Sequence, residues 1–183
     1  MGTVPTIATF SPGVLTAAYL NSIKAATDFV QSPPSCMAYH SAAISLTSGT
    51  STVLPLASEL FDNVQAGDPG CHDNVTNNSR LVARTAGKYE VAAQLGVATN
   101  GTGLRAIDLR LNAAGAPAGG SSIVAPQVAA LAGGTTIVII PVVNVQMAIG
   151  DYIEIFAFQN SGGALNTVAG ASQTFLRFKW VGI

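Results

Sequence analysis

Residues 61–95 of this chain read FDNVQAGDPGCHDNVTNNSRLVARTAGKYEVAAQL, a polar loop that runs into an alternating segment. In that segment apolar residues occupy every second position from Tyr89 to Val97, and the charged Lys88 and Glu90 stand between them. Strict alternation places apolar side chains on one face of a β-strand and polar side chains on the other. The stretch therefore predicts a long polar loop followed by a half-buried strand.

Working outward, the same strand character recurs with no helix between. The further segments are 104–111, 137–143, 152–159 and 174–181. In the first, Arg105, Asp108 and Arg110 interleave with leucine and isoleucine. Pro141 interrupts a run that is apolar on both faces, which indicates an edge strand or a bulge there. Short strands separated by turn residues predict an all-β sandwich or jelly roll.

A single helix is predicted ahead of the strands. Thr16 is a suitable N-cap, and the helix must end before Ser32-Pro33-Pro34 because the residue before a proline is pushed out of helical geometry. Its apolar stripe, widened by Tyr19 and Phe29, consists of Leu20, Ile23, Thr27 and Val30. A helix of about four turns is marginal alone in water. The β domain, sister helices or a larger assembly must cover the stripe, and the two prolines favour the last two.

Composition predicts association. Charged residues make up 9% of the 183 residues, against roughly 25% in an average soluble domain. The longest apolar run is too short to span a bilayer. We therefore expect much of the surface to be buried against other copies or partners, since obligate interfaces resemble a domain core cut in half. The net charge of −1 gives no field that would attract nucleic acid or an acidic membrane, so neither is predicted as a partner.

Both cysteines lie beside both histidines, as Cys36-x-x-x-His40 and Cys71-His72. Zinc takes sulfur and nitrogen ligands, so this is the strongest candidate for a metal site. Adjacent residues on a strand point to opposite faces, which leaves at most three good ligands. A disulfide is disfavoured because the N-terminus lacks a signal peptide and indicates synthesis in a cytosol. Buried, inert thiols are the expected state, and whether the cysteines pair stays open.

Catalytic signals are weak. There is no G-x-S-x-G elbow, and only two histidines could serve as a base. The acidic residues Glu59, Asp62, Asp68 and Asp73 could bind Ca²⁺, but they lack the regular spacing of a calcium loop and are interpreted as solvated loop charges. The sequence predicts no enzyme, no cofactor and no resident metal.

Three polar loops, residues 73–79, 98–103 and 160–166, are the candidate binding surface, because binding residues concentrate on loops held by a rigid scaffold. Their candidate contact residues are Asp73, Asn74, Asn77, Asn78, Asn100, Asn160 and Ser161. Arg80 is expected to pair with Asp62 or Asp73. Trp180 is expected to pack in the core or in an oligomer interface, given the large apolar area that an indole buries.

Several segments resemble one family. Residues 61–95, LRAIDLRLNAAGAP (104–117), MAIGDYIEIFAFQNSGGAL (147–165) and FLRFKWVG (175–182) are similar to the complement-globular-head/TNF-like jelly roll of bacteriophage structural proteins. The family's strand before residue 113 usually ends at Asn-Gly, whereas this chain has Asn112-Ala113. The head segment SPGVLTAAYLNSIKAATDFV (11–30) resembles the openings of phage tail and virion proteins.

The resemblance implies a compact homotrimer with a jelly-roll β-sandwich at residues 35–183 and an anchoring arm and helix at residues 1–34. It implies a non-enzymatic virion protein that joins other virion proteins through residues 1–31. A tail-associated role, as a minor tail protein or host-surface adhesin, is placed ahead of a capsid decoration or head-fibre protein at three-fold positions. In the adhesin role a host glycan or surface protein would be the partner.

Overall fold

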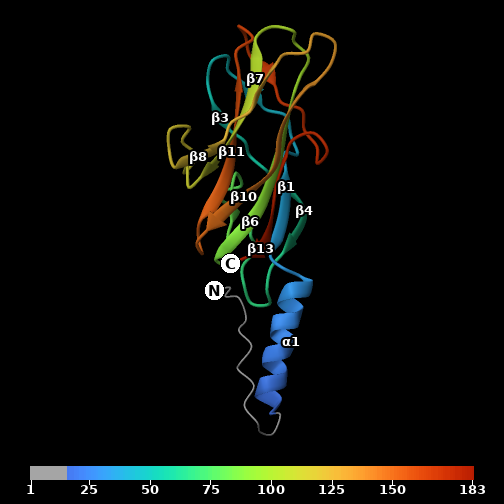
Figure 1. The fold of residues 1–183 in the computed structure, drawn as a ribbon. Helices are drawn as coiled ribbons and strands as arrows, with labels where there is room; N and C mark the ends of the chain where they lie inside the picture. The colour runs from blue at the N-terminus through green and yellow to red at the C-terminus, as the bar shows by residue number, and fades with distance from the viewer. Residues whose placement is uncertain (1–15) are drawn as a thin grey trace.

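The computed structural model describes residues 16–183, which form one helix and a sandwich of β-sheets (Figure 1). The helix is α1 (Ala17–Gln31). The strands are β1 (Ser35–Tyr39), β2 (Ser45–Leu46), β3 (Thr52–Val53), β4 (Ser58–Asn63), β5 (Leu81–Val82), β6 (Gly87–Val97), β7 (Leu104–Leu111), β8 (Ser121–Val124), β9 (Gln127–Ala129), β10 (Thr136–Met147), β11 (Tyr152–Gln159), β12 (Leu165–Asn166) and β13 (Phe175–Gly182).

Two antiparallel sheets form the sandwich. The five-stranded sheet has the order β10-β6-β13-β1-β4. The second sheet has the order β3-β11-β7-β8, with β5 added on β11 and β9 on β7. Strands β12 and β2 form a separate pair. The all-β architecture with one N-terminal helix is the one that the sequence predicts.

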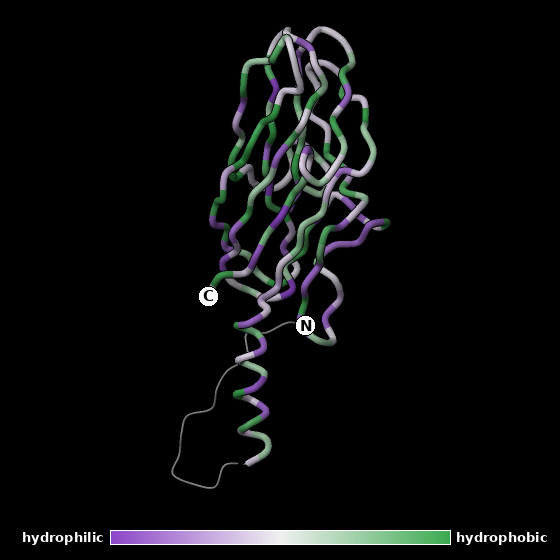
Figure 2. Tube along the Cα trace, turned by 90° about the vertical axis from the view of Figure 1, so that its right-hand side faces the viewer, coloured by the Kyte–Doolittle hydropathy of each residue, from purple (hydrophilic) through white to green (hydrophobic). Residues whose placement is uncertain are grey.

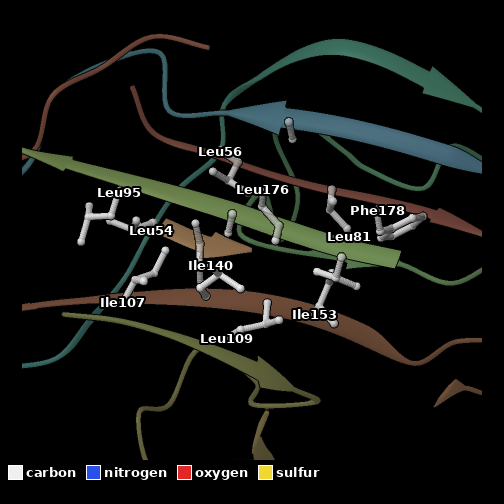
Figure 3. Packing of buried hydrophobic residues seen from close by; sticks show 14 of the residues in the cluster. Leu54, Leu56, Leu81, Leu95, Ile107, Leu109, Ile140, Ile153, Leu176 and Phe178 are labelled. Carbon is white, nitrogen blue, oxygen red and sulfur yellow. The ribbon is translucent and has the colours of Figure 1, made fainter. Parts of the chain in front are cut away.

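The core lies between the two inner faces (Figure 3). On β6 the alternating residues from Tyr89 to Val97 face inward, as predicted, and meet Ile107 and Leu109 of β7 and Ile153 of β11. The ring of Tyr89 packs edge-on against Phe178 of β13, with centroids 4.8 Å apart. Its hydroxyl donates to the Thr85 carbonyl oxygen at 2.7 Å, so the buried phenol is satisfied.

Strand β10 is at the edge of its sheet, and its register with β6 shifts between Ile140 and Val143. This confirms the edge and the bulge that Pro141 predicts, because proline has no N–H to donate to a ladder. Strand β7 differs from its sequence pattern. Arg105 lies on the buried face with Ile107 and Leu109, whereas Asp108 and Arg110 lie on the outer face.

Helix α1 has the predicted bounds. The Thr16 side chain accepts from the Tyr19 N–H at 3.3 Å, and Ser32 N–H donates to the Asp28 carbonyl at 2.9 Å at the other end. The helix extends from one end of the sandwich along its long axis (Figures 1 and 2). It is not long and apolar enough to cross a membrane, and it is the only helix that the structure describes.

The proline pair is not a free hinge, which corrects the interpretation from sequence. Phe29 is 1% exposed and packs edge-on against Trp180, with centroids 4.8 Å apart. The backbone N–H of Trp180 donates to the Pro34 carbonyl at 2.8 Å, and the side-chain amide of Gln65 donates to the Ser32 carbonyl at 3.0 Å. The last turn of the helix is therefore fixed on the sandwich, and Phe29 alone among the helix residues is buried.

Candidate functional site: the outer sheet face and the distal loops

The outer face of the five-stranded sheet is a layered surface, and the strand register defines its rows. One row, toward the end of the sheet away from α1, is Ile139, Gln94, Phe175 and Tyr39. The next is Ala92, Arg177, Met37 and Phe61, beside the bulge residue Val142. The third is Asn144, Glu90, Lys179, Ser35 and Asn63. Two of these rows are mainly apolar and the third is polar.

Several apolar side chains on this face are open to solvent. Ile139 is 57% exposed and Val142 is 52% exposed. Exposed apolar side chains that form a continuous patch mark an interaction surface, whereas scattered ones do not. The row arrangement makes this patch continuous across the sheet.

The same face holds four charged side chains without partners. These are Lys88, Glu90, Arg177 and Lys179, which are exposed and make no side-chain hydrogen bond or ion pair within residues 16–183. Glu90 lies directly opposite Lys179 across the β6–β13 pair, but the neighbours of Arg177 in register are Ala92 and Met37. Arg177 is thus a cation in an apolar row, and Glu90, on the neighbouring strand, lies one row away from it.

A hollow of about 340 Å³ lies at the end of this face nearest the helix. We call it the basal hollow. Its lining comes from the end of α1, from the residues that follow it and from the outer face of the sheet. The lining residues include Gln31, Pro33, Phe61, Val142, Glu90 and Arg177. The helix and the outer sheet face are therefore parts of one continuous surface.

At the opposite end of the sandwich four loops meet (Figure 1). Residues 47–51 and 160–166 are joined by the bond from Gly162 N–H to Ser48 Oγ, at 3.0 Å. Residues 98–103 are joined to the loop at 160 by the bond from Leu104 N–H to Asn160 Oδ1, at 2.6 Å. Gly103 accepts from Ala130 N–H at 3.0 Å, which adds the loop at 130–135. We refer to these four segments as the distal loops.

Arg105 lies beneath the distal loops and is fully buried. Its guanidinium donates to the carbonyl oxygens of Asn100 at 2.9 Å, Thr102 at 3.0 Å and Leu104 at 2.9 Å. Burial lowers the pKa of this guanidinium, which nevertheless stays protonated because its ordinary pKa exceeds 12. The loop at 98–103 is therefore held from inside by one cation, a role that alternation along β7 does not reveal.

Among the predicted contact residues, Asn100, Asn160 and Ser161 lie together in the distal loops. Asn100 Oδ1 accepts from Thr102 N–H at 2.8 Å, and Ser161 N–H donates to Gln159 Oε1 at 2.7 Å. These bonds fix the loop backbones and leave the outer surface polar. The three residues come from two loops that are about 60 positions apart in the chain, so only the fold brings them together.

The remaining predicted contact residues, Asp73, Asn74, Asn77 and Asn78, lie in a different place. Their loop packs beside the segment that leads into β4, where the backbone carbonyl of Asn78 accepts from the Leu56 N–H at 2.9 Å. Asp73 Oδ1 accepts from the N–H groups of Thr76 and Val75, and these bonds lower the pKa of its carboxyl. The three predicted loops therefore form two separate surfaces.

The sequence predicts that Arg80 pairs with Asp62 or Asp73, and this prediction is wrong. Its Nε donates to Glu154 Oε1 at 3.2 Å, and its guanidinium lies 4.3 Å from the centre of the Tyr152 ring. Glu154 is fully buried, and it also accepts from Ser79 Oγ at 2.7 Å and from Gly115 N–H at 3.0 Å. This arrangement ties the loop at 73–79 to β11 and is structural.

The cysteines and histidines do not form a metal centre in the described residues. Both nitrogens of His72 face carbonyl oxygens, those of Arg80 at 2.9 Å and Leu56 at 2.6 Å. His40 lies between the Pro55 carbonyl, at 2.7 Å, and Thr167 Oγ1, at 2.8 Å. Both thiols are free and buried, and burial, with the nearby Asp62 carboxylate, raises the pKa of each.

Comparison with known proteins identifies the fold of this chain but no sequence relative. No protein-family model and no curated protein matches the chain. Among solved structures, murine APRIL has a TM-score of 0.58 at 10% identity over 81% of this chain and 98% of its own. The Eiger TNF from S. frugiperda has a TM-score of 0.55 at 10% identity, covering 81% of this chain and 92% of its own. The globular domain of zebrafish complement 1qA has a TM-score of 0.52 at 9% identity, covering 81% and 97%.

The chain has the TNF/C1q-like jelly-roll fold. This confirms the fold class that the sequence predicts. In this TNF/C1q-like jelly roll the helix and the basal hollow occupy one end, the distal loops occupy the other, and the layered sheet face lies between them.

Proposed function

We propose that this chain is a non-enzymatic structural protein of a bacteriophage virion, a homotrimer that closes through the outer face of its five-stranded sheet. The observation that carries the proposal is that face, which is apolar over two rows and holds unpaired charges of both signs. The low charge content of the chain supports the same conclusion. The virion context is supported by the resemblance of residues 11–30 and 61–95 to phage virion proteins.

The row order suits a cyclic assembly. Rotation about an axis parallel to the strands does not shift any residue along that axis. Each row of one copy therefore faces the same row of the neighbouring copy. Apolar rows then bury apolar rows. The polar row brings Glu90 of one copy to the level of Lys179 of its neighbour, one row (about 7 Å) from Arg177. A carboxylate near Arg177 offsets the cost of burying its charge.

In such a trimer the two ends have different roles. The N-terminal segment, residues 1–31, attaches the trimer to other virion proteins, and the distal loops are presented outward. The polar groups around Asn100, Asn160 and Ser161 suit hydrogen bonding to a host-surface glycan or protein. We place the protein on the tail, as a minor tail protein or adhesin, and the alternative position is a decoration protein at capsid three-fold sites.

Light scattering coupled to size-exclusion chromatography tests the assembly. The unsubstituted protein should be a trimer, and Ile139→Asp should shift it toward monomer because three carboxylates would be buried in the apolar rows. Val75→Asp is the matched control, since Val75 is an 87% exposed apolar residue in the loop at 73–79, away from the sheet face. A monomeric unsubstituted protein, or equal effects of the two substitutions, would refute the sheet-face trimer.

The location on the particle needs a second measurement. Quantitative mass spectrometry of purified virions gives the copy number relative to the major capsid protein. A few trimers per particle support the tail position, and a number near that of the capsid three-fold sites supports decoration. Absence from purified particles would overturn the virion role. For the distal loops, Asn100→Ala and Asn160→Ala should reduce host-cell attachment, while Asn74→Ala, in the separate loop, should not.

A further inference from the structure

Most of the apolar stripe of α1 is open in the described structure: Leu20, Thr27 and Val30 are exposed, and Ile23 is half-buried. Leu20 is 52% exposed and Val30 is 75% exposed, although the helix end itself is fixed by Phe29 against Trp180. Phe29, which the sequence predicts to widen the stripe, is thus the residue that docks the helix, whereas Leu20 and Val30 stay exposed. A helix this short is marginal in water, so the stripe needs a partner.

The stripe has the spacing of a coiled-coil seam. Leu20, Ile23, Thr27 and Val30 are separated by three, four and three residues, which are the a, d, a and d positions of a heptad. Leucine at a with isoleucine at d shifts the preference of a coiled coil toward three or four strands. This pattern favours a small cyclic bundle over a single groove on an unrelated protein.

The position of the helix supplies its partners. Helix α1 continues along the long axis of the sandwich (Figures 1 and 2), and its last residue, Gln31, lines the basal hollow together with Arg177 and Val142 of the outer sheet face. If that face closes a trimer around an axis along the strands, the three helices emerge from the same end at the same height. Equivalent stripe residues then lie level with one another.

Charge does not oppose this packing. Lys24, at the e position beside the seam, is bonded to Asp28 of its own helix. The other flanking positions, Tyr19 and Ala26 at g and Gln31 at e, are uncharged. Three copies can therefore approach without like charges meeting along the seam.

We propose that the α1 helices of three copies pack in parallel as a three-helix stalk, with Leu20, Ile23, Thr27 and Val30 at its centre. The inference rests on the proposed sheet-face trimer and names the occupant of the stripe as two further copies of the same helix. The stalk continues the trimer axis beyond the sandwich, so the segment that attaches to the particle is itself trimeric. Its attaching surface is then the outside of the stalk and residues 1–15, and not the stripe.

Cysteine cross-linking of the full chain tests the stalk. Val30→Cys places a thiol at a central d position, and Ala25→Cys places one at the exposed f position on the opposite side of the same helix. The two native cysteines are fully buried, so the unsubstituted protein gives the background. With oxidised glutathione, Val30→Cys should be converted largely to a covalent dimer, because two of three central thiols can pair. Ala25→Cys should remain at background.

The oligomeric state of each variant, measured in the same samples, separates the two proposals. A trimer in which Val30→Cys cross-links no more than Ala25→Cys overturns the stalk and leaves the sheet-face trimer standing. A monomer overturns both. As a second readout, Leu20→Asp should lower the midpoint of thermal dissociation of the trimer and Ala25→Asp should not; equal midpoints would overturn the stalk.

Discussion

Substitution of Arg105 should destabilise the domain and loosen the distal loops together. Arg105→Met keeps the apolar stem of the side chain and removes three hydrogen bonds of 2.9–3.0 Å to loop carbonyl oxygens. A hydrogen bond to a charged group contributes about 1.5–3 kcal/mol. Three of them contribute roughly 5–9 kcal/mol before the cost of burying the guanidinium is subtracted.

That cost is several kcal/mol for a buried ion after relaxation. Because Met removes the ion as well as its bonds, we expect a net loss of about 2–4 kcal/mol in the free energy of unfolding. For a domain of this size each kcal/mol lowers the melting temperature by about 2–4 °C. The expected decrease is therefore about 4–16 °C. Arg105→Lys should be intermediate, since an ammonium cannot reproduce the planar fork.

The assay is thermal and denaturant unfolding at one protein concentration, with amide hydrogen exchange of residues 98–103. Arg110→Met is the matched control, because Arg110 lies on the outer face of the same strand and its guanidinium bonds to Asp108 and Gly119, not to residues 98–103. Exchange at residues 98–103 should increase in Arg105→Met and not in the control. A loss below about 0.5 kcal/mol, the range of surface substitutions, with unchanged exchange would refute the role given to Arg105.

Three further outcomes are expected. Glu90→Arg and Arg177→Glu should each weaken the trimer in sedimentation equilibrium, because the first gathers cations and the second gathers carboxylates on the face that closes the trimer; unchanged association in both variants would mean that this face is not the interface. Cys36 and Cys71 should be inert to an aromatic disulfide reagent in the native protein and react at once after denaturation, because burial raises the pKa of both thiols; rapid native reaction would contradict their burial. The Asp73 carboxyl should titrate in an NMR measurement below its unfolded pKa of about 3.9. Its contribution to the stability of the loop is therefore full above that pH and is lost as the pH falls through the lower folded pKa. A midpoint at the unfolded value would contradict the two N–H bonds that the carboxylate accepts.

The sequence predicted the elements that depend on local rules. Alternation located the long strand that ends at Val97, and the cap at Thr16 and the proline pair bounded the helix. Pro141 placed its strand at an edge with a bulge. Each of these follows from backbone geometry or from which side of an element faces water, and such properties are written in neighbouring residues.

The tertiary structure decided what depends on distant partners. Alternation groups Arg105 with the polar residues of its strand, yet it is buried because loop carbonyls converge on it. Arg80 pairs with Glu154, which lies 74 positions away, and not with an acid nearby in the sequence. The helix docks through Phe29 and leaves most of its stripe open, because Trp180 arrives from the far end of the chain. Pairings between residues far apart depend on strand order and register, and a local pattern cannot specify either.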